Sequence, residues 1–310
     1  MRLIVAGSDD FAVPSLEAVL AAGHPVLAAV TAPDRPGDRG RPAPRPLGDA
    51  ARARGIPVLQ PPRVRDPLAI ERLAKLGAEA LVVAAYGQLL PMRLLDRLVH
   101  GGLGVHPSLL PRHRGAAPIQ AAILAGDRET GVSLMRMEAG LDTGPVLGQV
   151  RVALAETATA PELRRALARE GALLLVAVLE ALGRGRAVAT VQDAAMATYA
   201  APLRRADGAL DWGRSAVEID RRLRALQPWP QVTIPLGGRR VRLLAGRPEP
   251  EAAPAPKGPP GTVLATRGEG VLVRCGVGGF WCERVQPPSG RPMGAASYLR
   301  GRRRPGPDSP

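Results

Sequence analysis

The sequence predicts an α/β fold: a doubly wound, mostly parallel sheet, followed by a smaller C-terminal β-barrel of the OB-like kind. In the first half, continuous apolar runs alternate with segments of helical periodicity, which is typical of a parallel sheet covered on both faces. From about residue 204 the apolar runs are separated by turn residues, which favours a small barrel. Hydrophobic residues make up 45% of the 310 residues, which is enough for a sizeable core.

The first half supplies clear strand and helix signals. Short apolar runs predict strands over residues 3–6, 26–30 and 81–85. A helix is expected from Pro14, with apolar residues on one face, and Gly23 ends it. Tyr86-Gly87 and His106 each come just after an apolar run. In open parallel sheets, ligands bind beyond the carboxyl ends of the strands, so both places are expected to face a ligand.

The second half begins with the strongest helix signal, over residues 159–182, where Thr159 and Glu162 have capping-box spacing and Gly183 stops the helix. A shorter amphipathic helix is expected over 216–226, followed by strands at 241–244, 262–265 and 271–274. Trp212 and Trp229 are expected in the core of the barrel. These signals predict a first domain over 1–187, a linker over 188–203, a barrel over 204–305 and a disordered tail over 306–310.

Composition narrows the function classes. Two cysteines are too few for a disulfide framework or a four-ligand zinc site, and no run of about 18 apolar residues occurs. We therefore expect a cytoplasmic protein with no membrane role. The net charge is +14, and residues 201–310 hold 19 Lys+Arg against 9 Asp+Glu. This excess suits a surface that faces a polyanion, or equally a solvated domain rich in arginine.

His106 and Asp142 are the residues most indicative of chemistry. The histidine follows a short apolar run, and the aspartate lies in a turn bracketed by Gly140 and Gly144. An imidazole can stabilise the oxyanion that forms when an amine attacks a carbonyl group. A nearby carboxylate raises the pKa of the imidazole and can move protons through water. The pattern therefore indicates an acid/base pair for acylation of an amine.

Three stretches carry a resemblance to a known family: 104–111 (GVHPSLLP), 112–120 (RHRGAAPIQ) and 140–144 (GLDTG). Together they resemble the active-site signature of the folate-dependent formyltransferases. The resemblance is closest to the members that formylate methionyl-tRNA. It extends through nearly the full chain, because Asp211-Trp212 and 227–230 (QPWP) resemble the opening of that family's C-terminal barrel.

The resemblance implies a role for each matching residue. It makes His106 and Asp142 catalytic, in a reaction whose formyl donor is 10-formyltetrahydrofolate, with no metal. Gly104 stands where the family has an asparagine, so a carboxamide donor is missing here. The implied folate-binding residues are Tyr86, Gly87, Gln88, Leu89, Ser108, Leu109, Leu110, Pro111, Gly140 and Leu141.

The implied amine substrate is the α-amine of charged initiator methionyl-tRNA, used in translation initiation. In the tRNA-formylating members a basic loop enters the acceptor end of the tRNA, and residues 33–46 form a similar Pro/Gly-rich loop here. Its implied tRNA-binding residues are Arg35, Arg39, Arg41 and Arg45. The resemblance also implies that residues 1–187 are catalytic, that the barrel holds tRNA and that the protein is a monomer.

Two alternatives remain open at this point. A formyltransferase that acts on another amine, such as an amino sugar nucleotide, would share the folate pocket without requiring the basic loop. A non-catalytic RNA-binding relative would retain the fold without the reaction, and Gly104 favours this second alternative because no side-chain donor stands at that position.

Overall fold

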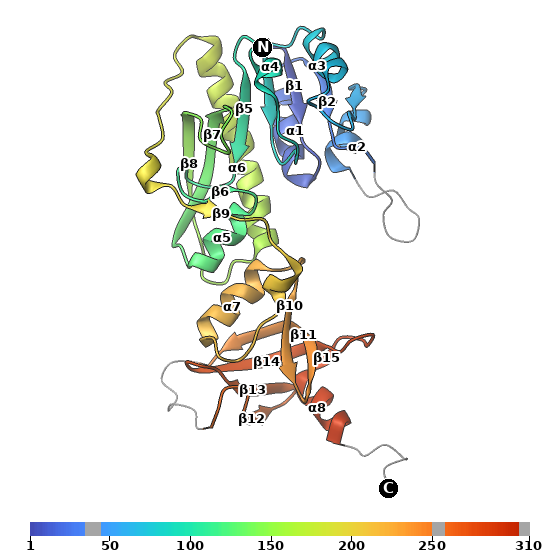
Figure 1. Cartoon of the computed structure of the whole chain (residues 1–310), viewed down its shortest axis with the longest axis vertical. Helices are drawn as coiled ribbons and strands as arrows, with labels where there is room; N and C mark the ends of the chain where they lie inside the picture. The colour runs from blue at the N-terminus through green and yellow to red at the C-terminus, as the bar shows by residue number, and fades with distance from the viewer. Residues whose placement is uncertain (35–44, 250–257, 304–310) are drawn as a thin grey trace. The chain divides into compact units, whose positions relative to one another are not determined.

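The structure, a computed structural model, describes residues 1–34, 45–249 and 258–303. The chain divides into two compact units (Figure 1). The first unit comprises Met1–Ile119, Arg128–Leu154 and Glu162–Ala201. The second comprises Gln120–Asp127, Ala155–Pro161 and the chain from Pro202 onward. The predicted tail over 306–310 lies outside the described residues.

A seven-stranded sheet in the order β3-β2-β1-β4-β5-β7-β8 forms the centre of the first unit. The five strands from β3 to β5 run parallel, whereas β7 and β8 are antiparallel to their neighbours. The predicted mostly parallel sheet is therefore confirmed. The strands are β1 Leu3–Ala6, β2 Val26–Val30, β3 Val58–Leu59, β4 Ala80–Val83, β5 Gly102–His106, β7 Glu129–Arg136 and β8 Val146–Ala153.

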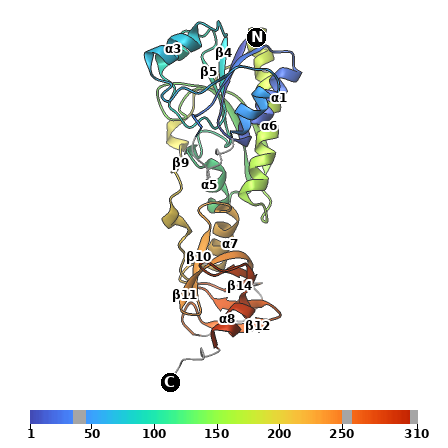
Figure 2. The ribbon, with the colours of Figure 1, turned by 90° about the vertical axis from the view of Figure 1, so that its right-hand side faces the viewer.

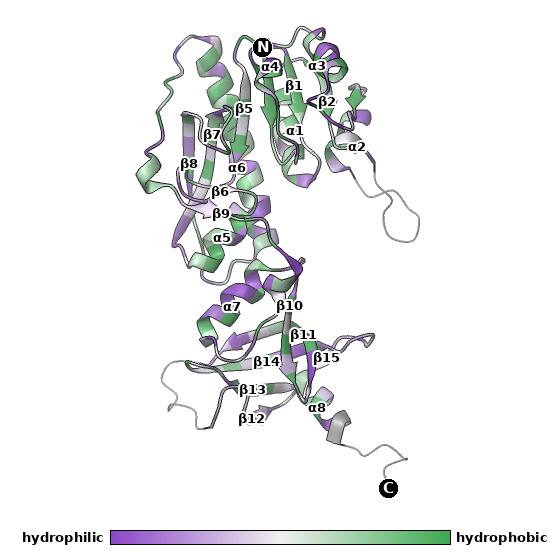
Figure 3. Ribbon diagram, in the orientation of Figure 1, coloured by the Kyte–Doolittle hydropathy of each residue, from purple (hydrophilic) through white to green (hydrophobic). Residues whose placement is uncertain are grey.

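Helices cover both faces of this sheet (Figure 2). They are α1 Val13–Ala21, α2 Pro46–Arg52, α3 Pro67–Ala74, α4 Met92–Leu95 and α6 Ala160–Gly183. A further helix, α5 Pro118–Ala125, falls mostly within the second unit. Figure 3 shows the strands between them as largely hydrophobic. Gly171 allows α6 to approach the sheet, because a Cβ there would lie 2.9 Å from Val105 Cγ1 and 3.2 Å from Val132 Cγ1. A larger residue would push the helix away from β5 and β7.

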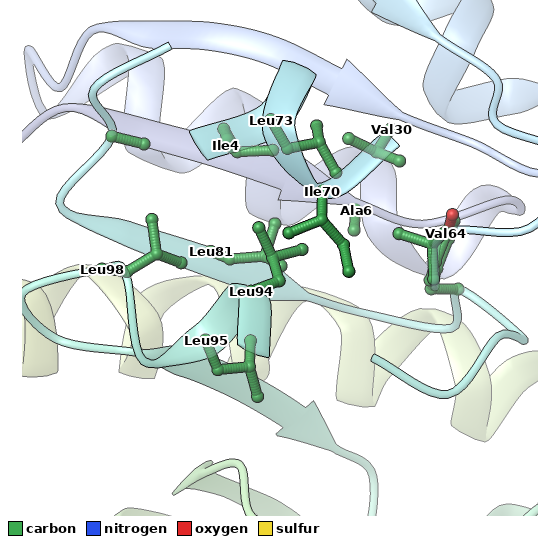
Figure 4. Packing of buried hydrophobic residues seen from close by; sticks show 12 residues of the cluster. Ile4, Ala6, Val30, Val64, Ile70, Leu73, Leu81, Leu94, Leu95 and Leu98 are labelled. Carbon is green, nitrogen blue, oxygen red and sulfur yellow. The ribbon is translucent and has the colours of Figure 1, made fainter. Parts of the chain in front are cut away.

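One face of the sheet packs against α3 and α4 through a cluster of buried aliphatic side chains (Figure 4). Ile70 and Leu73 from α3 and Leu94 from α4 meet Ile4 and Leu81 from the sheet. Buried apolar area of this kind is the main favourable contribution to folding. The cluster therefore fixes β4 next to β1 and orients the chain that leaves β4.

Tyr86 is part of this cluster and is 3% exposed, and among the described residues its hydroxyl has no hydrogen-bond partner. Burial raises the pKa of Tyr86 to about 12. A buried hydroxyl without a partner costs free energy, so we expect Tyr86→Phe to raise the free energy of unfolding by about 1 kcal/mol. Urea denaturation of both proteins measures this change. A lower free energy of unfolding in the variant would show that the hydroxyl is stabilised by a partner such as water.

The second unit contains a six-stranded antiparallel sheet in the order β10-β11-β14-β13-β12, with β15 paired to β14. The predicted change to a smaller C-terminal β domain is thus confirmed, and its strands form an antiparallel sheet. The capping box Ser215–Glu218 begins α7, as N-cap chemistry requires. The elements are α7 Ala216–Ala225, β10 Val232–Leu236, β11 Arg239–Pro248, β12 Val263–Arg267, β13 Gly270–Arg274, β14 Gly279–Gln286, β15 Met293–Gly294 and α8 Ala295–Arg303.

Two expectations from the sequence need correction. The strand predicted over 81–85 ends at Val83, because Ala85 adopts a positive φ of 50° that an extended strand does not permit. Trp229 is 54% exposed rather than buried, since it lies between two prolines in the turn that follows α7. Trp212 is 4% exposed, as predicted, and its indole N–H donates to the Pro235 carbonyl oxygen at 2.7 Å.

Candidate active site

His106 is the last residue of β5 and lies at the carboxyl end of the parallel part of the sheet. It is 7% exposed. Its Nε2 lies 2.9 Å from the His113 carbonyl oxygen, which can only accept a hydrogen bond. The proton of a neutral imidazole must therefore be on Nε2, and Nδ1 is left free for proton exchange.

Asp142 lies beside the free nitrogen of His106, with Oδ2 3.6 Å from Nδ1. The same oxygen accepts a hydrogen bond from the Gly115 backbone N–H at 2.8 Å. The aspartate has a φ of 53°, a left-handed conformation that is uncommon outside glycine. The structure thus brings together the imidazole and the carboxylate that the sequence analysis singled out.

The glycines on either side of Asp142 are required by the tight turn. A Cβ on Gly140 would lie 2.2 Å from Thr143 Oγ1, and a Cβ on Gly144 would lie 1.8 Å from the Arg136 carbonyl oxygen. A side chain at Gly144 would collide with the backbone, and one at Gly140 would collide with the Thr143 side chain. The pattern GLDTG is therefore explained by close approach of the backbone as well as by the aspartate.

Burial lowers the pKa of the His106 imidazole, although the Asp142 carboxylate and the hydrogen bond to His113 O oppose this effect. The neutral form is consequently favoured in the folded protein. Between the lowered pKa and the unfolded value of about 6.5, the unfolded chain binds more protons than the folded chain. The stability that comes from burying a neutral His106 is therefore fully present above the unfolded pKa. It is lost as the pH falls below that value, because the buried imidazole resists protonation.

We therefore expect acidification from about pH 7.5 to about pH 5.5 to destabilise the wild type more than a His106→Gln variant. Glutamine cannot titrate, so the variant lacks this part of the pH dependence. Thermal unfolding of both proteins across the pH series checks the difference. Parallel curves for the two proteins would show that His106 has the same pKa in the folded and unfolded states.

Gly104 lies two residues before His106 on the same face of β5, opposite Met135 of β7. A Cβ at this position would lie 3.1 Å from Met135 Cε, which is the end of a flexible side chain. A Cβ at this position therefore requires only a small shift of the methionine. In this protein the position offers no side-chain hydrogen-bond donor.

A cavity of about 660 Å³ opens where the chain leaves β4. It is lined by Tyr86, Gly87, Gln88 and Leu89, the first segment that the sequence analysis assigned to folate, together with Ser8, Ala32, Arg45, Arg63, Arg65 and Ala85. Val83 is paired with Gly104 in the parallel register of β4 and β5. The lining segment therefore continues from the strand that pairs with β5, although neither His106 nor Asp142 is among the residues that line the cavity.

The other residues assigned to folate lie apart from the lining of this cavity. Ser108 is fully buried, and its hydroxyl donates to the Arg112 carbonyl oxygen at 2.6 Å. Leu110 is also buried, and its N–H donates to Ser133 Oγ at 2.9 Å. The segment that also includes Leu109 and Pro111 is therefore shaped by its own hydrogen bonds. Gly140 and Leu141 are exposed in the turn next to Asp142.

Of the four arginines assigned to tRNA, Arg35, Arg39 and Arg41 lie outside the described residues. Arg45 lines the cavity, and its Nη2 donates to the Pro33 carbonyl oxygen at 2.6 Å. Its Nε is buried and has no hydrogen-bond partner among the described residues.

Residues around the pair that the sequence analysis missed are Arg114 and Gln192. The Arg114 guanidinium donates twice to Gln192 Oε1, and Gln192 Nε2 donates to the carbonyl oxygens of Asp142 and Gly144. Gln192 belongs to the segment assigned to a linker, where the periodicity is loose. Its sequence gives no signal of a contact with a turn about 50 residues earlier.

The doubly wound unit with its buried His–Asp pair, followed by the small antiparallel unit, has the architecture of the formyl transferases. The sequence matches the family model of formyl transferase over residues 1–179 and that of the formyl transferase C-terminal domain over residues 202–303. The chain belongs to this family. No helix in the described part of the chain is long and apolar enough to cross a membrane.

Several relatives that match over nearly the whole length are named methionyl-tRNA formyltransferase. The protein of that name from Xanthomonas axonopodis pv. citri is 49% identical over 305 residues, which are 98% of each chain. The one from Heliobacterium modesticaldum is 42% identical over 309 residues, again 98% of each. Among solved structures, an N-formyltransferase from Helicobacter canadensis, in complex with folinic acid and dTDP-3-aminofucose, has a TM-score of 0.67 at 16% identity. That comparison covers 91% of this chain and 98% of the other.

Proposed function

We propose that this protein is an enzyme that transfers the formyl group of 10-formyltetrahydrofolate to the α-amine of initiator methionyl-tRNA. Its membership of the formyl transferase family and its full-length identity to relatives named methionyl-tRNA formyltransferase support this function. The observation in the structure that carries the proposal is the buried His106–Asp142 pair, in which Asp142 Oδ2 lies 3.6 Å from His106 Nδ1 at the carboxyl end of β5.

The reaction forms a bond between the α-amine nitrogen and the formyl carbon and breaks the bond from that carbon to N10 of the folate. The amine must lose a proton, and the carbonyl oxygen carries negative charge in between. In the proposed roles, His106 Nδ1 and Asp142 take up the proton from the amine and pass it to N10 of the departing tetrahydrofolate, and the imidazole stabilises the oxyanion. The lowered pKa of His106 suits the uptake of a proton from the amine, because the imidazole is then neutral at neutral pH and can accept one.

The cavity is the proposed folate site. Backbone groups of the segment 86–89 would orient a flat ring with polar edges, as ligand pockets commonly do. Arg63 and Arg65 would lie near the carboxylates of the ligand. Solved neighbours were crystallised with folinic acid or with tetrahydrofolic acid, which supports a donor derived from folate. Ser108–Pro111 and the turn at Gly140–Leu141 remain proposed parts of the same site.

The C-terminal unit is the proposed tRNA-binding surface. Its exposed arginines include Arg239, Arg267, Arg284 and Arg291, none of which forms an ion pair within the described parts of the chain. Unpaired guanidinium groups can bind phosphate oxygens. Arg35, Arg39, Arg41 and Arg45 are proposed to hold the acceptor end near the active site.

We expect the affinity for charged initiator tRNA to fall by at least about tenfold between about 50 and about 200 mM salt, because phosphate contacts release counterions. Fluorescence anisotropy with labelled tRNA measures this dependence, and binding of the folate donor over the same salt range is the control. An affinity for tRNA that does not change with salt would contradict the proposed role of the arginines.

The proposed function is tested by formylation assays with three acceptors: charged initiator tRNA, the same tRNA with an acetylated α-amine, and an amino sugar nucleotide. We expect product only with the first. Product with the sugar amine would support the alternative suggested by the Helicobacter canadensis neighbour. Binding of tRNA without product would identify a non-catalytic relative. The monomeric state and the cytoplasmic location stay predictions, the first open to analytical ultracentrifugation.

A further inference from the structure

Gln192 uses its whole amide to join Arg114 to the turn that carries Asp142. Its Oε1 accepts hydrogen bonds from Arg114 Nε at 3.1 Å and Nη2 at 2.8 Å. Its Nε2 donates to the carbonyl oxygen of Asp142 at 2.9 Å and to that of Gly144 at 2.7 Å. An amide group has two donors and an oxygen with two lone pairs, so the hydrogen-bonding capacity of Gln192 is fully used.

Arg114 determines which way the Gln192 amide points. Arg114 is 4% exposed, and a guanidinium can only donate hydrogen bonds. The oxygen of the amide must therefore face Arg114, and the NH₂ group must face the two carbonyl oxygens of the turn. In this one orientation the amide accepts from the buried arginine and donates to the turn. An amide flip would break both sets of hydrogen bonds at once.

The turn needs to be held from outside, because its own residues favour other conformations. Asp142 has a positive φ of 53°, which a non-glycine residue keeps only when its surroundings enforce it. On the carboxylate side the turn is held by the Gly115 N–H. On the backbone side it is held by Gln192, which binds carbonyl oxygens within the turn and just after it.

Gln192 is part of a longer strap, which we define as residues 190–200. At its start, Thr190 and Val146 exchange backbone hydrogen bonds of 2.8 Å. At its end, β9 (Tyr199–Ala200) pairs in parallel with β6 (Arg114–Gly115). The strap is thus anchored at both ends on the first unit, and Figure 1 shows β6 and β9 side by side.

The strap also supports the backbone groups that contact the pair. Thr198 Oγ1 accepts a hydrogen bond from the His113 N–H at 2.8 Å. The His113 carbonyl oxygen in turn accepts from His106 Nε2. One segment therefore supports the partner of the imidazole through Thr198 and the turn of the carboxylate through Gln192.

We propose that Gln192, oriented by Arg114, is a positioning residue that holds the Asp142 turn so that the carboxylate stays beside the His106 imidazole during formyl transfer. This inference rests on the proposed function, because it concerns the same site. Gln192 acts through Asp142. Its loss is expected to reduce kcat by about 10- to 100-fold, the usual effect of misplacing a catalytic group by about 1 Å.

Two variants separate positioning from folding. Gln192→Glu keeps an acceptor for Arg114 and adds an ion pair, but it places an oxygen opposite the carbonyls of Asp142 and Gly144. Gln192→Met is neutral and similar in size, and it removes the donors without adding charge. We expect kcat to fall in both variants. KM for methionyl-tRNA should stay within about twofold of wild type, because Gln192 is not proposed to contact the bound substrate. Asp193→Asn is the matched control, since Asp193 caps only the Ala195 N–H within the strap.

The second readout does not depend on activity. The chain has four histidines, so the His106 resonance can be assigned by its disappearance in a His106→Gln variant. We expect its pKa to fall below the wild-type value in Gln192→Met, because Asp142 and His113 are the charged and titratable groups that face it and the carboxylate moves away.

The outcomes are distinct. Loss of kcat in both variants together with the shift in His106 titration supports the proposal. Wild-type kcat and wild-type titration in folded Gln192→Glu overturn it, even if Gln192→Met does not fold. A wild-type protein that forms no formyl product contradicts the proposed function alone, and the titration of His106 then decides whether Gln192 positions Asp142.

Discussion

Replacement of His106 by glutamine is expected to lower kcat for formyl transfer by about 10²- to 10⁴-fold, the usual contribution of a positioned acid/base group. Glutamine places an N–H near the position of Nε2, so the hydrogen bond to His113 O can be retained. It has no group equivalent to Nδ1, which faces Asp142 at 3.6 Å. The variant therefore removes the proton exchange while it keeps the packing. Single-turnover formylation measures the loss.

The matched control is His100→Gln, because His100 lies between α4 and β5, away from the pair. We expect this variant to retain the wild-type rate. Thermal unfolding at neutral pH shows whether His106→Gln is folded. If the folded His106 variant formylates at the wild-type rate, the imidazole has no part in the chemistry and the proposed roles are wrong.

The second large effect is expected to be an increase in kcat. Gly104→Asn should raise kcat by up to about 10²-fold, because one missing oxyanion donor typically costs about 10²–10³ in rate. The new side chain would lie on the face of β5 that carries His106, and Met135 Cε must move by a few tenths of an ångström to admit its Cβ. Steady-state kinetics with charged initiator tRNA measure the gain.

Gly104→Ala is the control for this experiment. It adds the same Cβ and tests the contact with Met135, but it supplies no donor. We expect alanine to leave kcat near the wild-type value. If asparagine gives no increase over alanine, another group already binds the oxyanion, and the glycine is not a defect of the site.

Local patterns in the sequence were sufficient to predict much of the sheet and to single out His106 and Asp142. Strands 3–6 and 26–30 are predicted by continuous apolar runs, and they have the same bounds in the structure. The helix expected over 159–182 is observed as Ala160–Gly183, because its capping residues and its final glycine are local signals. His106 was identified because it follows an apolar run, where a parallel sheet is expected to face a ligand, and Asp142 because it lies in a turn bracketed by glycines.

Contacts between distant segments could not be predicted in the same way. Gln192 and Arg114 are joined by side-chain hydrogen bonds across 78 positions, and neither residue lies in a pattern that indicates its partner. Residues 188–203 have the composition of a linker, but β9 and the 3-10 helix Ala194–Met196 lie within them. A two-residue strand such as β9 depends on its tertiary partner, which here is β6.

The cavity illustrates a second limit. The segment 86–89 lines it, whereas the Ser108 side chain is directed to backbone groups of its own loop. Both segments follow apolar runs and contain polar residues, so the sequence alone does not separate a residue that lines a cavity from one that shapes a turn. Burial and hydrogen bonding decide between these two cases, and both depend on the folded chain.

The central claim is tested most directly by following an isotopically labelled formyl group from 10-formyltetrahydrofolate in a single turnover with charged initiator tRNA, using wild-type protein and Asp142→Asn. We predict that the label appears on the methionine α-amine with the wild type and arrives at least about 10²-fold more slowly with the folded variant. No transfer of label by the wild type, or equal rates for the two proteins, would contradict the account.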